Sequence, residues 1–450
     1  MTQRPPIKLH NAPPANQSES GKPTPEALAQ RDTGWRWRYL FMAPHRLSFF
    51  LAMVVLVAAG AWWALVQTDR ATGWLGLPFV LSPTVVHSAV MVLGFIPLFF
   101  AGFLFTAGPK WLGVDALPVS ALRMALLAQA AGWLLWLVGG HLHAGVALLG
   151  VALAAGGLVA VTLQFWGRVR LSRVDDQVHA RVIAVACSVG SVSVVGLLAS
   201  LALDEFGAAR AWVLTGLWGF VVVVYVTVAH RMIPFFTASA VPGVRAWRPF
   251  WVLWLMLGAA GWQVLSVWLE WAGVPQSAAA TAWTLVHGGV QLVIGGVLVW
   301  LTFAWGLVQS LKNRLLAMLH LGFVWLGIAF VLGGAAQWLT WWLGTGVLGL
   351  AALHALTMGC LASLMVAMVT RVSCGHSGRA LVADRLAWSL FWLLQSAVVL
   401  RLAATVPGMP GAMLPWLLLA AAWVWAATMA VWGVRLGRWY GWLRADGRPG

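Results

Sequence analysis

The sequence predicts an all-α, polytopic integral membrane protein with twelve transmembrane helices and both termini in the cytoplasm. Hydrophobic residues make up 61% of the 450 residues and charged residues only 9%, whereas soluble domains carry roughly 25% charged residues. The apolar residues form long unbroken runs, which favours helices over the alternating strands of a membrane β-barrel. The basic residues lie in short segments between these runs, so the net charge of +16 indicates membrane topology, and no nucleic-acid partner is expected.

Each predicted helix is an apolar run close to or longer than the roughly 20 residues that cross a bilayer. In chain order the runs are Leu47–Val66, Val80–Thr106, Ser120–Gly139, Ala144–Trp166, Arg181–Leu203, Ala211–Phe236, Phe250–Trp271, Ala279–Leu311, Leu315–Leu339, Gly346–Thr370, Leu386–Val406 and Leu414–Arg435. Many of the 32 tryptophans lie near the ends of these runs, as expected for an aromatic belt at the membrane surface.

The distribution of positive charge supports this count. With a cytoplasmic N-terminus and twelve spans, all but three of the 28 Lys and Arg fall on the inner side, as the positive-inside rule requires. The exceptions are Arg70, Arg210 and Arg401. Residues 1–34 are polar and rich in Pro, Gln and Ser, which predicts a disordered cytoplasmic tail. Residues 35–450 then form one transmembrane domain.

Histidine is the ionisable residue found inside the predicted spans, because the nearest acidic residues, Asp204, Glu205 and Glu270, lie at or beyond span ends on the outer side. Ion-coupled transporters usually bind their ion through a buried carboxylate or a broken helix, so its absence weighs against transport. A buried neutral imidazole can ligate a metal or a haem iron. The five histidines within spans are His87, His230, His287, His320 and His354.

Three of these histidines are expected at one depth. His87, His287 and His354 each follow the start of an inward-running span by 7 or 8 residues, which places them about 10–12 Å below the outer surface. Such imidazoles could converge on a metal or a haem. The alternative for each is a hydrogen bond between neighbouring helices.

Two of the three also carry a methionine four residues later. His87 precedes Met91 and His354 precedes Met358, and residues at i and i+4 share one helical face. A thioether suits Cu(I) and can also be a haem axial ligand. The alternative is that these methionines fill gaps in packing.

A second group of candidates lies towards the cytoplasm, where arginine beside histidine could bind haem propionates, lipid phosphates or anionic substrates. The alternative is ordinary positive-inside charge. This group comprises His45 before the first span, His230 and Arg231 at the end of the sixth, His320 early in the ninth, and His376 in a predicted loop over residues 371–379.

Taken together, these motifs resemble those of the NnrS family of bacterial membrane proteins. The matching stretches run in order along nearly the whole chain after the tail. They are APHRLSFF at 43–50, the run 87–111, HRMIPFFT at 230–237, LHLGF at 319–323, HALTMG at 354–359 and RVSCGHSGR at 371–379.

The resemblance implies a multi-pass protein of the bacterial inner membrane that carries haem b and copper. It implies a role in relieving nitrosative stress by handling nitric oxide or iron-nitrosyl species, and a distant likeness to haem-copper oxidases. Many family members have a second histidine and an acidic residue between His87 and Met91. Here those positions are Ala89 and Val90, so copper is less expected than haem.

Several alternatives stay open. Reduction of nitric oxide consumes protons, and the spans lack the carboxylates that would relay them, so binding or transfer is favoured and enzymatic turnover is undecided. A secondary transporter without a redox cofactor is the other interpretation, since glycine pairs such as Gly139-Gly140, Gly156-Gly157 and Gly288-Gly289 permit helix breaks or close packing. The electron donor and the oligomeric state are not determined by the sequence.

Overall fold

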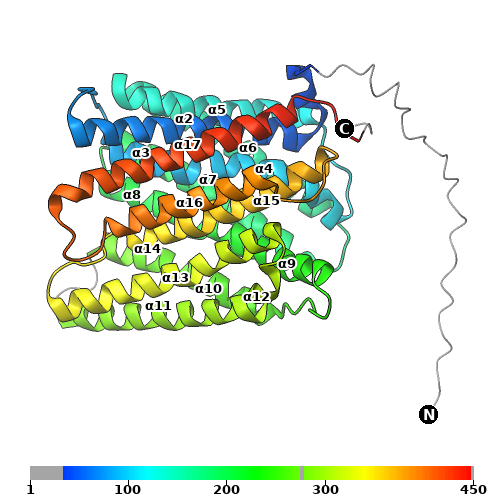
Figure 1. Ribbon diagram of the computed structural model, residues 1–450. Coiled ribbons are helices and arrows are strands. Elements are labelled where there is room, and N and C mark those ends of the chain that lie inside the picture. The colour runs from blue at the N-terminus through cyan, green and yellow to red at the C-terminus, as the bar shows by residue number, and fades with distance from the viewer. Residues whose placement is uncertain (1–33, 274–277, 447–450) are drawn as a thin grey trace, which may run out of the picture.

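The computed structural model describes residues 34–273 and 278–446 and is a bundle of helices that lie side by side (Figure 1). Within these residues, twelve helical stretches are long and apolar enough to cross a membrane, and no strand is present. The predicted all-α, twelve-span fold is therefore confirmed. Residues 1–33 of the predicted tail lie outside the described residues.

The first half of the chain contains η1 (Trp37–Met42), α2 (Pro44–Thr72), α3 (Pro83–Leu93), α4 (Phe95–Leu112), α5 (Val119–Leu142), α6 (Ala144–Leu171), α7 (Val178–Ala202), α8 (Phe206–Thr215), η2 (Gly216–Val222) and α9 (Val223–Ala240). The second half contains α10 (Phe250–Trp271), α11 (Ala278–Ala304), α12 (Leu307–Ser310), α13 (Arg314–Leu343), α14 (Ala351–His354), η3 (Ala355–Ala362), α15 (Ser363–His376), α16 (Arg385–Ala403), η4 (Gly411–Met413) and α17 (Leu414–Tyr440).

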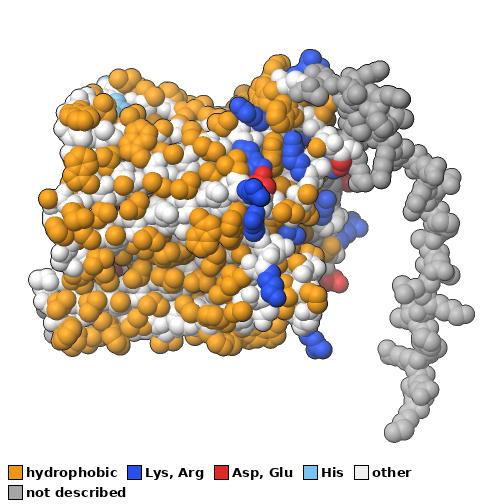
Figure 2. All heavy atoms as spheres, in the orientation of Figure 1, with side chains coloured by type: hydrophobic (Ala, Val, Ile, Leu, Met, Phe, Trp, Pro, Cys, Tyr) orange, Lys and Arg blue, Asp and Glu red, His pale blue; other side chains and the backbone are white. Residues whose placement is uncertain are grey.

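Charge and apolar surface are separated along the bundle. Figure 2 shows a flank covered by hydrophobic side chains, with Lys and Arg gathered at the end where α2 begins and α17 ends. We call this the basic end, and the other the opposite end. The backbone N–H of Arg36 donates to the carbonyl of Gly441 at 2.9 Å, which ties the two termini of the bundle together. An apolar flank of this kind suits lipid rather than water.

Glycines allow neighbouring helices to approach closely. A Cβ on Gly132 of α5 would collide with the Gly150 carbonyl of α6, and a Cβ on Gly295 of α11 would lie 2.9 Å from the Gly327 carbonyl of α13. In lipid, packing between small residues replaces the hydrophobic driving force between helices. The α5–α6 and α11–α13 pairs are therefore held by backbone contact.

Two predicted spans are interrupted. The run Val80–Thr106 was expected as one helix, but it breaks at Gly94, where a Cβ would collide with the Val90 carbonyl oxygen. The run Ala279–Leu311 ends earlier than predicted, because Gly306 adopts a left-handed φ of 92° and the short α12 follows. Hydropathy alone detects neither break, because both flanking segments are apolar.

Other helices extend beyond the apolar runs. His376 was predicted in a loop, but residues 371–376 are the last turns of α15. His45 was predicted before the first span, but it lies in the first turn of α2, which starts at Pro44. Proline is favoured at that position because its missing N–H has no helical partner there. Polar residues therefore continue these helices past the apolar core.

Two wide helical turns interrupt the regular backbone. η2 and η3 are π-helical, with i→i+5 hydrogen bonding, inside the sixth and tenth spans. Such segments are rare and are frequent at functional sites. η3 begins directly after His354, so the wide turn sets the direction of that side chain.

Candidate functional site

A cavity of about 270 Å³ lies between the helices near the opposite end. Its walls come from α2, α3, α4, the η2 and η3 spans, α16 and α17, so it is enclosed by both halves of the chain. The four residues of the two His-x3-Met motifs, His87, Met91, His354 and Met358, all line it. The structure therefore brings these two predicted motifs to one place.

His87 is held by stacking rather than by hydrogen bonds. It lies on α3, and its ring stacks on the Trp63 indole of α2. Its Nδ1 is buried and has no hydrogen-bond partner among the described residues. A buried polar atom without a partner is costly, so this nitrogen is available to a ligand.

His354 has one ring nitrogen engaged and one left over. Its Nδ1 lies 3.0 Å from the carbonyl oxygen of Leu350, one turn earlier. A carbonyl only accepts, so Nδ1 carries the hydrogen and Nε2 is the unprotonated nitrogen. This arrangement is usual for a metal-ligating histidine, whose second nitrogen is oriented by a backbone carbonyl.

Two arginines complete the cavity wall. Arg70, near the end of α2, and Arg401, near the end of α16, both line it. Arg70 also lies over the Trp63 ring, with its guanidinium carbon 5.2 Å from the centroid, and donates to Thr84 at 3.5 Å. Both are among the three basic residues that depart from the positive-inside pattern. A cation kept away from the basic end, beside an apolar cavity, indicates an anionic ligand.

A smaller apolar void of about 60 Å³ shares part of its wall with the cavity. Tyr225 and Met365 line both spaces, and the remaining wall of the void is made of Phe, Val and Met side chains from α2, α4, α9 and α15. The Tyr225 hydroxyl, which can donate a hydrogen bond, therefore belongs to a side chain that both spaces share.

The protein-family comparison identifies the relatives of this chain. The family model described as NnrS, NnrS protein, matches residues 39–444. The chain belongs to the NnrS family. The matched region contains every span and all ten residues expected to bind a cofactor. No curated protein matches the chain.

In this NnrS-family chain, His287 does not reach the cavity. It lies on α11, which packs against α13, and its ring stacks on Trp283 with centroids 5.2 Å apart. The Trp262 indole donates to Nδ1 at 2.9 Å, and the Gln291 amide lies 2.7 Å from Nε2. Both nitrogens are occupied, so the expected convergence of three imidazoles is not seen, and the hydrogen-bonding alternative describes His287.

His45 and His376 form a separate pair at the basic end, with ring centroids 4.4 Å apart. His45 Nδ1 lies 3.5 Å from the Thr106 hydroxyl. The neighbouring Arg46 donates to the carbonyls of Trp442, at 2.8 Å, and Tyr440. Arg46 therefore fixes the end of α17, and this pair lies at the end of the bundle that is remote from the cavity.

His230 pairs with a histidine that the sequence reasoning missed. His230 Nε2–H donates to the Pro249 carbonyl at 3.1 Å, so its Nδ1 accepts from His179 Nε2–H at 3.0 Å. His179 lies in the first turn of α7, before the predicted span, where hydropathy does not count it. Arg231 lies over the Trp111 ring at 5.2 Å.

His320, on α13, is fully buried, and its Nε2 lies 2.9 Å from the Thr237 hydroxyl of α9. Thr237 donates its own hydrogen to Ile233, so His320 donates to it. The structure does not bring His320 or Arg231 to the cavity, and their contacts join neighbouring helices.

The cavity residues that the sequence did not predict include Trp63, Arg70 and Arg401. For the two arginines a signal was present, since both are outer exceptions in the positive-inside pattern. Trp63 gave no signal, because a tryptophan near a span end is normally an interfacial anchor.

Proposed function

We propose that this protein binds haem b in the cavity between His87 and His354 and uses it to handle nitric oxide. It would do so in the bacterial inner membrane, with its termini in the cytoplasm, as part of the response to nitrosative stress. The observation that carries the proposal is that two imidazoles with free nitrogens and two arginines line one apolar cavity. The iron of haem would bind the imidazoles, and its two carboxylates would bind the arginines.

The residues fit such a group in charge and chemistry. His87 Nδ1 is unpartnered, and the indole N–H of Trp425 in the same wall is also buried without a partner. Ligand pockets usually measure roughly 300–1,000 Å³, so the space of about 270 Å³ must widen for a macrocycle. Met91 and Met358 line this space, and their unbranched side chains are adaptable.

In this arrangement His87 and His354 would hold the iron, and Arg70 and Arg401 would hold the propionates. Bound haem would supply an iron that can take up nitric oxide in exchange for one of the two imidazoles. The neighbouring apolar void suits an uncharged diatomic molecule, and Tyr225, which lines both spaces, offers a hydrogen bond. None of the described residues lining the cavity is Asp or Glu. This favours binding or transfer over reduction, which needs a proton relay.

Copper, which the resemblance implied, is a weaker proposal for this chain. Among the described residues no group of three His, Cys, Asp or Glu could hold a metal ion. Ala89 stands where many family members have a second histidine. The soft methionine sulfurs of the cavity would suit Cu(I), but they share their space with the proposed haem.

The test is a visible spectrum and metal analysis of the purified full-length protein. We expect a Soret band, near one haem and one iron per chain, that shifts when nitric oxide is added. A colourless, metal-free protein from haem-replete cells would contradict the proposal and favour the secondary transporter. Copper without haem would assign the same residues to a copper site.

A further inference from the structure

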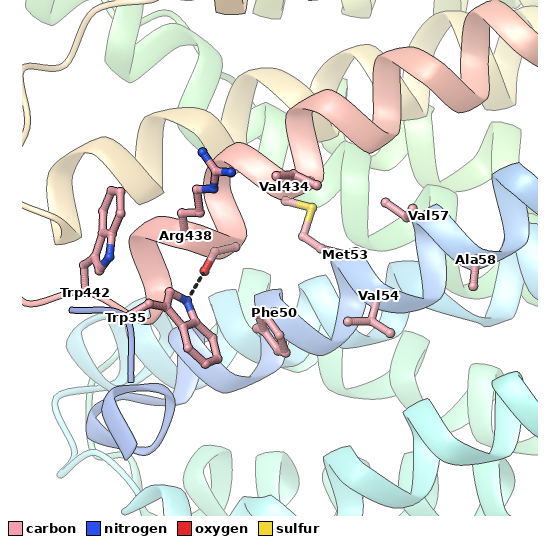
Figure 3. A pocket seen from close by; sticks show the side chains of 11 residues that line it. Trp35, Phe50, Met53, Val54, Val57, Ala58, Val434, Arg438 and Trp442 are labelled. Atoms are coloured by element: carbon pink, nitrogen blue, oxygen red, sulfur yellow. Dashed lines mark hydrogen bonds between the residues drawn. The ribbon is translucent and has the colours of Figure 1, made fainter. Parts of the chain in front are cut away.

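A second space lies on the outside of the bundle. It is an open groove of about 680 Å³ between α2 and α17, at the basic end. Figure 3 shows Trp35, Arg438 and Trp442 at one end of the groove and Val57 and Ala58 towards the other. Both helices are transmembrane spans, so the groove faces the lipid and not the cavity described above.

The groove exists because α17 lacks side chains where it faces α2. A Cβ on Gly433 would lie 3.0 Å from Val57, and a Cβ on Gly437 would lie 3.7 Å from the Phe50 ring. The rest of the wall is apolar and includes Val54 and Val434, which are exposed. An apolar furrow of this kind would accept a hydrocarbon chain.

The basic end of the groove carries a positive charge that none of the described residues neutralises. Arg438 is exposed and makes no hydrogen bond or ion pair among the described residues, whereas Arg435 pairs with Asp384 and Arg444 with Asp446. The Trp35 indole is fixed beside it by donating to the Gly437 carbonyl at 3.2 Å (Figure 3). Tryptophan and arginine together are typical of the lipid headgroup level.

We propose that this groove binds one anionic phospholipid, with its phosphate on Arg438 and an acyl chain along α2. The groove follows α2 from Phe50 to Ala58, about 12 Å at 1.5 Å per residue, and one leaflet of the hydrocarbon core is about 15 Å thick. A second copy of the chain is a poorer occupant. A two-fold axis normal to the membrane and passing through the groove would place both copies of Arg438 in one interface, and none of the described residues in the groove wall is an Asp or Glu that could pair with them.

The experiment compares lipid retention by full-length variants. Each is purified in mild detergent and incubated with mixed micelles of equal parts phosphatidylglycerol and phosphatidylcholine, and bound lipid is counted by native mass spectrometry. Wild type should retain phosphatidylglycerol preferentially. Arg438→Gln should lower that preference about fivefold. Gly437→Leu, whose added Cβ meets nothing closer than 3.7 Å, should reduce retention of both lipids by filling the groove.

Matched controls separate the groove from general effects. Arg123 is an exposed arginine in the first turn of α5, also at the basic end, and Gly156 faces open space on α6. Arg123→Gln and Gly156→Leu should bind lipid like wild type. An unchanged lipid preference in Arg438→Gln, or an equal loss in Arg123→Gln, would overturn the proposal. A dimer that Gly437→Leu converts to monomer without loss of lipid would assign the groove to a second copy. Elution volume and thermal unfolding establish that each variant is folded.

Discussion

The imidazole of His87 lies flat against the indole of Trp63, with ring centroids 3.8 Å apart and planes inclined by 16°. The Arg70 guanidinium also lies over the Trp63 indole. One residue of α2 therefore orients both a candidate iron ligand and a candidate propionate partner. A rigid aromatic support of this kind keeps a ligand in position before its partner binds.

Removal of the Trp63 indole should weaken haem binding without abolishing it. An aromatic pair contributes about 0.5–1.5 kcal/mol beyond the area it buries, so Trp63→Ala should lower haem affinity by roughly two- to tenfold. Trp63→Phe keeps a ring and should lose less. Haem titration of apoprotein, followed at the Soret band, measures the effect. Trp74, which is 82% exposed, provides the control. An equal loss of haem affinity in Trp74→Ala would show that the effect does not come from the contact between Trp63 and His87.

Loss of either candidate ligand should remove the cofactor. His87→Ala and His354→Ala are each expected to give near-complete loss of the Soret band, because each variant lacks one of the two imidazoles that would hold the iron. His287→Ala should keep the band, since both nitrogens of that ring are used within the protein. The measurement is haem per chain in purified protein. If His87→Ala and His354→Ala retained full haem, the ligand assignment would be wrong.

The two outer arginines should affect affinity rather than iron ligation. A hydrogen bond to a charged group contributes about 1.5–3 kcal/mol, so Arg70→Gln and Arg401→Gln should each weaken haem binding roughly ten- to hundredfold. The position of the Soret band should stay the same, because the iron ligands are unchanged. Arg210→Gln is the control, since Arg210 is the remaining outer arginine and does not line the cavity. Equal affinities in all three variants would argue against a propionate role.

Position 94, at the break between α3 and α4, should tolerate only glycine. A Cβ at Gly94 would collide with the Val90 carbonyl and lie 2.9 Å from Val90 Cγ2, so Gly94→Ala should cost about 1–3 kcal/mol of stability. Thermal unfolding in detergent measures the cost. Gly156→Ala, where the added methyl group meets open space, should show no loss. A Gly94→Ala protein as stable as wild type would show that the break can straighten.

The carboxylate of Asp384 should stabilise the basic end in a pH-dependent manner. It accepts from Arg435 Nη1 at 2.8 Å and caps α16 through the Ala387 N–H at 2.9 Å. The hydrogen bond from Arg435 holds the pKa of Asp384 below its usual range. Its contribution is therefore full above the unfolded pKa of about 3.9 and is lost as the pH falls through the lower folded pKa.

Asp384→Ala should accordingly cost about 1 kcal/mol near neutral pH, as for other helix N-caps. The difference from wild type should shrink as the pH is lowered below about 4. Denaturant unfolding across this range measures it, with Asp115→Ala, in the exposed loop before α5, as the control. A difference that is independent of pH would show that the carboxylate charge is not responsible.

The spans could be predicted because the bilayer imposes one length and one polarity on every crossing helix. The breaks could not, since Gly94 and Gly306 interrupt runs that stay apolar on both sides. The helix ends were also underestimated. α2 begins at Pro44, before its apolar run, and α15 continues through His376 after its own, because helical hydrogen bonding does not depend on hydropathy.

For the candidate site, sequence spacing identified the residues but not their partners. His87 and His287 are expected at the same depth, and both lie in apolar stretches of the chain. They differ in what surrounds them in space: Trp262 and Gln291 occupy both nitrogens of His287, whereas Nδ1 of His87 has no partner. Depth along a span is readable from sequence, but rotation about the helix axis and the arrangement of helices are not.

The wide turn at η3 gives the tenth span a register that depends on one extra residue. Each residue of an α-helix turns the chain by about 100°. Deletion of a single residue between Ala355 and Ala362 would let the segment regularise as α-helix and so take up the lost residue, leaving His354 and α15 facing as they do now. The same deletion in an α-helical part of a span would instead swing the residues before it by about that angle, and an imidazole there would point to a different neighbour. A homologue shortened by one position within η3 would therefore keep both the architecture and the direction of its imidazole.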